Sequence, residues 1–351
     1  MIRLDPAETT ALIDGSIQMI DFKVLDQDGA DVNASSMKWK VSGNLSPVTM
    51  FMASMQKLLI APNETAETLT LTATDPADPS VTASAVIHLV RESDLKLQIN
   101  PQSAMLAAGK TLQLTADVQP EAAKNLELKW GSSDESIATV DENGLISGRK
   151  AGKALITASI GKVYAQSEVL VLFKDVANPS SYYFDPVYWA LENDITTGTG
   201  PDLFSPKDKV TRGQTVTFLY RMAGEPEVTP GNSFIDVDPD KYYAKAVYWA
   251  LENGITTGYT DGSRKFGPND KCTREQFVTF LYRAAGKPVP AETKMFADEK
   301  AGAYYVDAIS WAAEKAITIG LDDGTDRFGV GMSCNRAMAV TFLMRYDQAN
   351  Q

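Results

Sequence analysis

The sequence predicts a multidomain protein, with all-β domains in its first half and all-α units in its second half. Apolar residues alternate with polar ones in short runs up to about residue 172, and later recur at helical spacing. The second half also repeats three times, with a period of 60 to 62 residues. At 351 residues the chain is long for one hydrophobic core, which agrees with several domains.

Residues 92–172 contain the clearest strand pattern. Asn143-Gly144 lies between two apolar runs and predicts a two-residue hairpin, because both residues tolerate a positive φ. Short strands at this spacing predict a β-sandwich. Four apolar residues alternate as in a strand with one buried face: Leu112, Leu114, Ala116 and Val118.

Residues 1–91 resemble a diverged copy of the same sandwich. Apolar residues alternate again along Val81 to Leu89. Trp39 and Trp130 are 91 residues apart, and we expect each to lie in the core of its sandwich. The stretch 50–60 has no pattern that predicts its structure.

Three similar units follow, at residues 173–230, 231–292 and 293–351. Equivalent tryptophans lie 60 and 62 residues apart, and equivalent arginines lie 62 residues apart in both steps. An intact internal order at this period predicts three copies of one supersecondary unit. The equivalent residues are Trp189, Trp249 and Trp311, and Arg212, Arg274 and Arg336.

Each unit is expected to contain two helices joined by a loop. In the first unit Tyr183, Val187 and Ala190 share one helical face. The second helix begins at a Thr-Arg-x-Gln sequence in units one and two, where Thr and Gln form a capping box. The third unit has Asn335 and Met338 at these positions, so it keeps the cap and loses the box.

The second domain resembles the bacterial immunoglobulin-like group 2 family over most of residues 95–172. Members of this family are usually spacers or adhesive modules on bacterial surfaces, so the resemblance implies one of these roles. The matching motifs are Trp130-Gly131-Ser132-Ser133-Asp134, Ile137-Ala138-Thr139-Val140-Asp141, Asn143-Gly144-Leu145 and Ala151-Gly152.

Residues 173–351 resemble the S-layer homology family. The signature Thr-Arg-Ala-Glu occurs as Thr211-Arg212-Gly213-Gln214, Thr273-Arg274-Glu275-Gln276 and Asn335-Arg336-Ala337-Met338. The resemblance implies an all-α pseudo-threefold spindle that follows two Ig-like sandwiches, with sugar-binding grooves between its prongs. The ligand it implies is a secondary cell-wall polysaccharide, often carrying a pyruvate ketal whose carboxylate meets the signature Arg. All three copies lack the signature Glu, and Val330 replaces the loop proline in the third.

The candidate polysaccharide-binding residues recur in each unit. Arg212, Arg274 and Arg336 can bind a carboxylate through two parallel N–H groups, and a helix start would add unpaired backbone amides. The aspartates of the opening Phe-x-Asp could accept bonds from sugar hydroxyl or amide groups, and the tryptophans could face sugar rings. These further candidates are Asp175, Asp236 and Asp298, and Trp189, Trp249 and Trp311.

Each candidate has a structural alternative. The arginines could be solvated or paired on the surface, the aspartates could cap a turn, and the tryptophans could pack in the core. A second set of arginines lies late in the second helix, where a cation favours the negative end of the helix dipole, and we interpret it as structural. This set is Arg221, Arg283 and Arg345.

Other chemistry finds little support in the sequence. Cys272 and Cys334 are equivalent positions 62 residues apart, and we expect free thiols because separate repeats should keep them beyond the disulfide limit of about 7 Å. One histidine and two cysteines predict no metal site. The acidic run 322–326 resembles a calcium loop but lacks the bidentate Glu, so it predicts a turn. No nucleophile elbow or phosphate loop is present, so we expect neither catalysis nor a cofactor.

Composition narrows the partners and the location. A formal net charge of −12 argues against nucleic acid, and no apolar run approaches the roughly 20 residues of a membrane span. No signal peptide is visible at the start, although the rest suggests an extracellular, wall-bound protein. We therefore expect non-covalent anchoring to an anionic cell-wall polysaccharide. A further expected partner is another copy of the chain, through self-association or a surface lattice. The alternatives are an adhesin that binds through its Ig-like domains, or the anchoring end of a larger surface enzyme.

Overall fold

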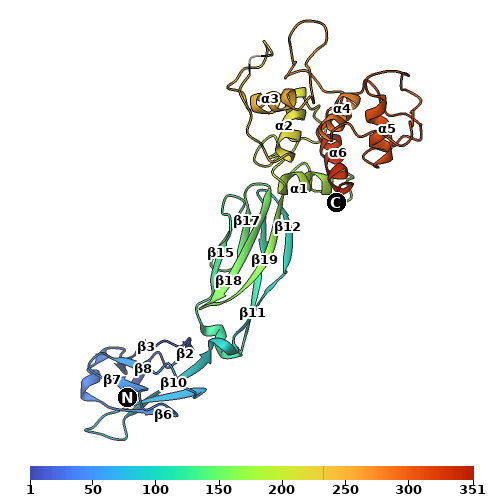
Figure 1. The fold of residues 1–351 in the computed structure, drawn as a ribbon. Helices are drawn as coiled ribbons and strands as arrows, with labels where there is room; N and C mark the ends of the chain where they lie inside the picture. The colour runs from blue at the N-terminus through green and yellow to red at the C-terminus, as the bar shows by residue number, and fades with distance from the viewer. Residues whose placement is uncertain (232) are drawn as a thin grey trace. The chain divides into compact units, whose positions relative to one another are not determined.

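The computed structural model describes residues 1–231 and 233–351 (Figure 1). The chain divides into two compact units. The β unit comprises residues 1–148 and 154–170, and the helical unit comprises residues 149–153 and 171–351. An all-β region followed by a helical region agrees with the predicted fold class, whereas the five domain limits stay predictions.

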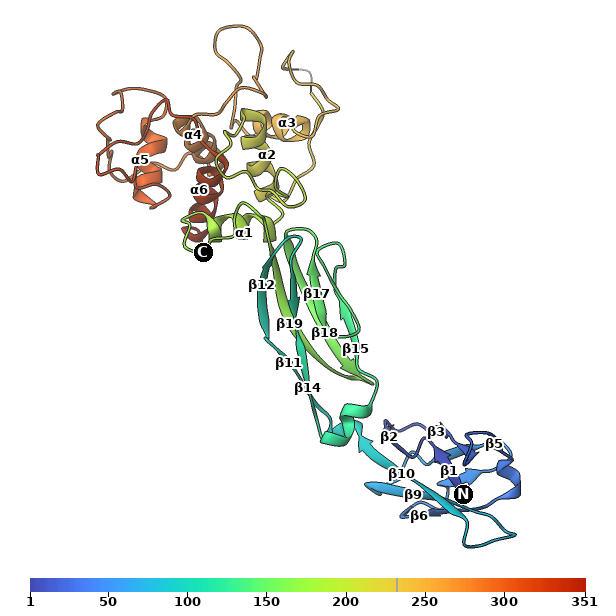
Figure 2. The same ribbon diagram turned by 180° about the vertical axis from the view of Figure 1, so that it is seen from behind.

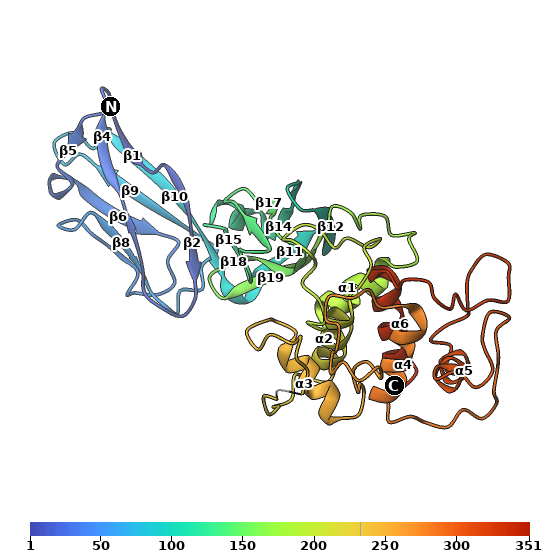
Figure 3. The same ribbon diagram turned by 90° about the horizontal axis from the view of Figure 1, so that it is seen from above.

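The first sandwich, best seen in Figure 3, has a four-stranded sheet in the order β2-β10-β9-β6. Two three-stranded sheets accompany it, in the orders β1-β4-β5 and β3-β8-β7. Fully buried side chains such as Phe22, Leu71 and Ile87 form its core. The strands are β1 (Ile2–Asp5), β2 (Glu8–Ile13), β3 (Gln18–Asp21), β4 (Lys23–Asp26), β5 (Asp31–Val32), β6 (Lys38–Ser42), β7 (Met50–Met52), β8 (Lys57–Ile60), β9 (Thr68–Thr74) and β10 (Thr82–Arg91).

The second sandwich has a four-stranded sheet in the order β12-β19-β18-β15 (Figure 2). A three-stranded sheet, β13-β17-β16, and the pair β11-β14 complete it. The strands are β11 (Lys96–Asn100), β12 (Ser103–Ala107), β13 (Thr111–Gln113), β14 (Thr115–Gln119), β15 (Lys129–Ser132), β16 (Ala138–Val140), β17 (Leu145–Gly148), β18 (Gly152–Ile160) and β19 (Val163–Leu172).

The sequence expectations for the sandwiches have mixed outcomes. A hairpin at Asn143-Gly144 is confirmed, since it joins β16 to β17. Its turn is longer than the predicted two residues, because the amide of Asp141 donates to the carbonyl of Leu145 and only Gly144 of the pair has a positive φ, +80°. The run from Leu112 to Val118 is two strands rather than one, because the chain leaves one sheet at the fully buried Leu114 and joins another. Both sandwich tryptophans are only partly buried; Trp39 stacks on Phe51 with ring centroids 3.9 Å apart.

The two sandwiches share a small apolar cluster around the connection from β10 to β11. The hydroxyl of Thr10 in the first sandwich donates to the carbonyl of Ala122 in the second at 3.0 Å. The amide of Lys162 donates to the carboxylate of Glu92 at 2.8 Å. These contacts explain why the β unit is compact. The buried members of the cluster are Val90, Leu95, Val118, Ala123 and Ile160.

In the described residues of the helical unit, each repeat contains two helices, as predicted. The second helix of each repeat contacts the first helix of the next repeat, and the last helix contacts the first one: α2 packs on α3, α4 on α5 and α6 on α1 (Figure 1). Each helix pair is therefore assembled from two repeats. The helices are α1 (Phe184–Glu192), α2 (Arg212–Met222), α3 (Ala244–Glu252), α4 (Arg274–Ala284), α5 (Val306–Glu314) and α6 (Arg336–Gln348).

The starts of α2, α4 and α6 are capped as the sequence predicts. The Thr211 hydroxyl accepts from the Gln214 amide at 3.2 Å, and the Gln214 side chain accepts from the Thr211 amide at 3.0 Å. α4 begins with the same capping box. The Asn335 side chain accepts from the Met338 amide at 2.8 Å, so α6 keeps a cap without the box. Each such cap stabilises its helix by about 1 kcal/mol.

The residues just before these helices meet in a closed ring of backbone hydrogen bonds. The amide of Val210 donates to the carbonyl of Cys334, that of Cys272 to Val210, and that of Cys334 to Cys272, at 2.9 to 3.0 Å. Equivalent positions of the three repeats therefore converge. Together with the cyclic helix contacts, this ring ties the repeats into one core.

The ring corrects one expectation about the cysteines. Both thiols are buried and unpaired, but the reason given for this was wrong. A hydrogen bond of 2.9 Å from the amide of Cys334 to the carbonyl of Cys272 leaves their Cα atoms no more than about 7 Å apart. Burial raises the pKa of Cys272 to about 12 and also raises the pKa of Cys334, which disfavours the reactive thiolates.

Candidate functional site

The opening aspartate of each repeat holds the loop that follows the first helix. The two carboxylate oxygens of Asp175 accept from the amides of Phe204 and Ser205 at 2.9 and 2.7 Å. Asp236 and Asp298 make equivalent bonds at 2.7 to 2.8 Å. Burial raises the pKa of Asp298, but its amide bonds outweigh burial and lower it below the usual value. The three carboxylates thus hold loops, and their contact with sugar stays a prediction.

The phenylalanine carbonyl in each of these loops binds the signature arginine of another repeat. The Nε of Arg212 donates to Phe266 at 2.8 Å, and Arg274 and Arg336 do the same to Phe328 and Phe204 at 2.9 and 2.7 Å. Each guanidinium carbon lies 4.6 to 4.9 Å from the ring centre of the same phenylalanine. The loop of one repeat therefore orients the arginine of its neighbour.

The backbone at the helix start differs from the expectation of unpaired amides. The amide of Arg212 donates to the carbonyl of Asp270, and that of Gly213 donates to Pro268, both at 2.9 Å. The amides of Arg274 and Arg336 are bonded in the same way by neighbouring loops. The interlocking of the repeats uses these donors, so an anion would depend on the arginine side chains.

All three signature arginines are buried cations without a carboxylate partner. They are 3 to 5% exposed, and among the described residues no carboxylate lies within ion-pair distance of any of them. Burial lowers the pKa of Arg274, and lowers that of Arg336 to about 10. Because a buried charge without a counter-ion is unfavourable, an anion in contact with these groups would be stabilised.

The terminal nitrogens of the three guanidinium groups are not equally engaged. Arg274 directs one toward the Met338 sulfur at 3.4 Å and another toward the Gly320 carbonyl at 3.3 Å. Arg336 donates from one to the Thr196 hydroxyl at 3.2 Å. For Arg212, Nε makes the hydrogen bond described above, and the described part of the chain offers its terminal nitrogens no comparable acceptor. Arg212 therefore has the most donors left for a ligand.

Arg212 lines a groove of about 280 Å³ built from three repeats. Repeat 2 contributes the loop after α3 and one face of α4, and repeat 3 contributes Tyr304. The Tyr259 hydroxyl donates to Asp270 at 2.7 Å, and burial is the main cause that raises its pKa to about 12. The lining of this Arg212 groove is Arg212, Thr256, Thr257, Gly258, Tyr259, Thr260, Gln276, Thr279, Phe280, Arg283 and Tyr304.

Arg274 lines an equivalent groove of about 270 Å³ with different side chains. Leu321 and Met338 replace the tyrosine and glutamine of the Arg212 groove, and Asp322 adds a carboxylate. An apolar lining with an acid favours an anionic sugar less than the Arg212 groove does. The lining of this Arg274 groove is Tyr182, Arg274, Thr318, Ile319, Gly320, Leu321, Asp322, Met338, Thr341, Phe342 and Arg345.

Arg336 opens instead onto a hollow of about 530 Å³ between repeat 1, repeat 2 and α6. Its lining is mostly polar and carries several charged side chains. The residues of this Arg336 hollow are Thr199, Lys207, Asp208, Lys209, Thr211, Gln214, Lys271 and Arg336.

The predicted tryptophans do not line these cavities. Trp249 is 8% exposed and packs on Tyr220, with ring centroids 5.7 Å apart. Trp311 is 3% exposed and packs on Tyr282 at 5.5 Å. Trp249 and Trp311 therefore pack between helices, the alternative that the sequence left open, and a sugar contact by any of the three tryptophans stays a prediction.

The candidate residues named from the sequence did not include the tyrosines that line the grooves. The first tyrosine of each pair is 59 to 63% exposed, and its ring lies edge-on against the second tyrosine. Tyr304 and Tyr182 line the Arg212 and Arg274 grooves. The repeated Tyr-Tyr pair in the sequence could have indicated them, because when two aromatic residues are adjacent one can be buried while the other faces solvent. The three equivalent tyrosines are Tyr182, Tyr242 and Tyr304.

The arginines late in the second helices also have a larger part than expected. Arg221, Arg283 and Arg345 each donate to the isoleucine carbonyl that follows a first helix, at 3.1 to 3.4 Å. Arg283 and Arg345 line the Arg212 and Arg274 grooves as well. These arginines thus have a structural role, the contact with a loop carbonyl. The same position puts a second cation in the Arg212 groove and in the Arg274 groove.

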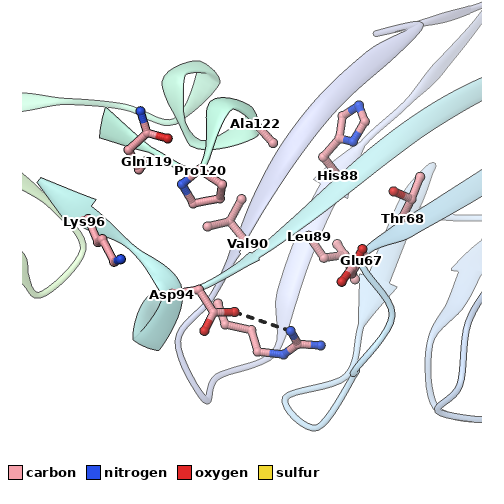
Figure 4. A pocket seen from close by; sticks show the side chains of 11 residues that line it. Glu67, Thr68, His88, Leu89, Val90, Asp94, Lys96, Gln119, Pro120 and Ala122 are labelled. Atoms are coloured by element: carbon pink, nitrogen blue, oxygen red, sulfur yellow. Dashed lines mark hydrogen bonds and ion pairs between the residues drawn. The ribbon is translucent and has the colours of Figure 1, made fainter. Parts of the chain in front are cut away.

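A separate hollow of about 570 Å³ lies at the joint of the two sandwiches (Figure 4). Arg91 lies 3.5 Å from Asp94 and His88 lies 2.9 Å from Glu8, while the other charged residues of the lining are Glu67 and Lys96. Because the positive and negative charges of the lining balance, it gives little preference for a charged ligand. This joint is where an adhesin activity of the β unit would be sought.

Residues 1–231 and 233–351 contain no cluster of three histidine, cysteine or acidic side chains that could hold a metal ion. No helix in the same residues is long and apolar enough to cross a membrane.

Comparison with known families agrees with the two resemblances. Residues 96–171 match the model of the bacterial Ig-like domain (group 2). Residues 172–216 and 233–278 match the model of the S-layer homology domain.

The chain is also similar to parts of larger proteins. It is 37% identical over 112 residues to an endoglucanase of Bacillus sp. (strain KSM-635), which covers 32% of this chain and 11% of that protein. It is 24% identical over 269 residues to the surface-layer 125 kDa protein of Lysinibacillus sphaericus, covering 70% of this chain and 22% of that protein. The chain thus spans about a tenth to a fifth of these relatives.

Similarity to solved structures is weaker. The crystal structure of the S-layer protein rSbsC aligns with 15% identity and a TM-score of 0.21, covering 43% of this chain and 22% of that one. The assignment therefore depends on the family models and the repeat geometry. Residues 96–171 are a bacterial Ig-like domain of group 2, and residues 172–216 and 233–278 are S-layer homology domains, an arrangement that supports a cell-surface anchoring protein.

Proposed function

We propose that the helical unit binds an anionic secondary cell-wall polysaccharide without a covalent bond and so anchors a bacterial surface protein. The observation that carries this proposal is the set of three buried arginines without carboxylate partners, each facing a cavity or hollow between repeats. A stable fold tolerates such charges best where a ligand supplies the counter-ion.

The Arg212 groove is the main site in this proposal. The planar guanidinium can donate two parallel N–H bonds to a carboxylate such as that of a pyruvate ketal. Hydroxyl groups of threonines in the loop after α3 and the Gln276 side chain line the same groove and can bind sugar hydroxyls. Tyr304 offers a flat face to the C–H surface of a sugar ring.

The proposed frame of these sites is a pseudo-threefold spindle. It is supported by the ring of backbone bonds at Val210, Cys272 and Cys334, and by the closing contact of α6 with α1. In this arrangement no repeat forms a groove alone. The limits expected for the three repeats would then mark units of sequence, while each groove would be formed by residues from more than one repeat.

The β unit is proposed as a spacer between the wall and whatever the surface protein displays. The similarity to an endoglucanase over 112 residues supports the alternative that such a chain forms the anchoring end of a surface enzyme. The similarity to a surface-layer protein supports association with a lattice. The complete reading frame would decide between these, because a hydrolase domain or lattice domains would be visible in it.

Sedimentation with purified cell walls tests the anchoring. The full chain and residues 173–351 are expected to sediment with walls, whereas residues 1–172 should stay in solution. Sedimentation of residues 1–172, with residues 173–351 left in the supernatant, would move the binding site to the Ig-like region and contradict the proposal.

A further inference from the structure

The Arg336 hollow has an unusual concentration of positive charge. Lys207, Lys209 and Lys271 line it together with Arg336, and Asp208 is the acidic residue in the lining. Residues 173–351 as a whole carry 19 Lys and Arg against 24 Asp and Glu, a net charge of −5. A local excess of three positive charges therefore lies on an acidic unit.

These lysines are exposed, and their charges are not used within the protein. Among the described residues no carboxylate lies within ion-pair distance of the three ammonium groups. Other lysines of the same unit are paired, as Lys174 is with Asp202 at 2.5 Å and Lys241 with Asp238 at 4.0 Å. The charges in the Arg336 hollow thus remain available to an external anion.

The ring of the three repeats brings the lysines together. Lys209 is bridged to Asn335 and Lys271 to Thr211, so each lysine lies beside the start of α6 or α2. The equivalent position in repeat 3 is Ser333. The cluster of lysines therefore lies on this side of the ring, whereas the Arg212 and Arg274 grooves are each lined by two arginines and no lysine.

We propose that the Arg336 hollow is a second anion subsite, which binds further carboxylate or phosphate groups along the same polymer whose ketal occupies the Arg212 groove. This inference rests on the proposed function. Ammonium groups are compact point charges without the fork of a guanidinium, so they favour several anionic groups without fixing one geometry. Contacts of this kind weaken strongly with salt, unlike a buried bidentate pair.

The test uses the full chain and three variants. Lys207→Gln/Lys209→Gln/Lys271→Gln removes the three charges, and Lys245→Gln/Lys300→Gln/Lys315→Gln is a control with the same change in net charge at exposed lysines elsewhere. Asp208→Asn removes the acid of the hollow. Binding to cell walls is measured over a range of NaCl concentrations.

The first triple variant should bind on the order of tenfold more weakly at low salt and depend less on salt. The control should bind like the parent, and Asp208→Asn should bind more tightly. If both triple variants behave alike while Arg212→Ala releases the chain from walls, the subsite is wrong and the anchoring stands. If none of these changes alters binding to walls, the anchoring proposal itself fails.

A second measurement is independent of cell walls. The chain is titrated with polygalacturonic acid, with polyglycerol phosphate and with monomeric galacturonic acid. The polymers should lose affinity for the first triple variant and keep it for the control, and the preferred polymer identifies carboxylate or phosphate as the source. Equal binding of both polymers to the two triple variants would overturn the subsite.

Discussion

Replacing Arg212 by alanine should weaken binding of the wall polysaccharide more than the same change at Arg274 or Arg336. Arg212 is 5% exposed, and its terminal nitrogens are the least engaged of the three. Truncating one partner of a buried, hydrogen-bonded charge pair costs about 2–5 kcal/mol. Since about 1.4 kcal/mol corresponds to a tenfold change, the loss of affinity is expected to be roughly 30-fold or more.

The comparison among the three arginines controls for damage to the fold. Each variant removes one buried cation and one Nε bond to a phenylalanine carbonyl. Arg274→Ala and Arg336→Ala also lose hydrogen bonds of the terminal nitrogens, so Arg212→Ala should lower the melting temperature least although it should weaken binding most. Arg336→Ala should lose the least affinity for the ketal, because Arg336 in the parent protein lines the wide Arg336 hollow and not a groove like that of Arg212.

Calorimetry with purified wall polysaccharide measures the affinities, and melting curves measure stability. Arg212→Lys should fall between the parent and Arg212→Ala, because it keeps the charge and loses the planar fork. If Arg336→Ala alone abolished binding, or if all three variants lost the same affinity, the reasoning would be refuted.

Three further predictions concern the frame of the grooves. Thiol titration of the unfolded, unreduced protein should report two free groups, Cys272 and Cys334, and finding none would show a disulfide. Gly258→Ala should cost about 2–4 kcal/mol of stability, since the φ of Gly258 is +76° and a Cβ there would lie 2.4 Å from a phenylalanine ring atom. Gly262→Ala is the control and should cost less, because Gly262 has a φ of +79° and a Cβ there would have nothing within 4 Å. Equal melting temperatures of the two variants would contradict this prediction. Asp298→Asn should cost about 1–3 kcal/mol at neutral pH. Because the folded state lowers the pKa of Asp298, that difference should vanish as the pH falls below about 4, and a difference independent of pH would count against the role.

Local patterns in the sequence predicted much of the fold. The Asn143-Gly144 hairpin, the capping boxes and the two helices per repeat depend on neighbours within a few residues, and all are confirmed. The stretch 50–60 was not predicted, although it forms β7 and β8. Its methionines face solvent beside buried leucine and isoleucine, which hides the alternation of a strand.

Features that depend on contacts between repeats could not be predicted from one repeat. The carbonyl that binds Arg212 belongs to Phe266, 54 residues later, and the one that binds Arg336 belongs to Phe204, 132 residues earlier. The same interleaving brings Cys272 beside Cys334, which the period alone had seemed to keep apart. The recurrence of the arginine could therefore be read from the sequence, while its surroundings required the structure.

The central claim is that a carboxylate of the wall polysaccharide binds the buried arginines. The most direct measurement is calorimetric titration of the full chain with purified polysaccharide before and after its ketal-linked pyruvate is removed by mild acid. Removal should lower the affinity by roughly 30-fold or more, close to the loss caused by Arg212→Ala with intact polysaccharide. Unchanged affinity for the depyruvylated polymer would contradict the account.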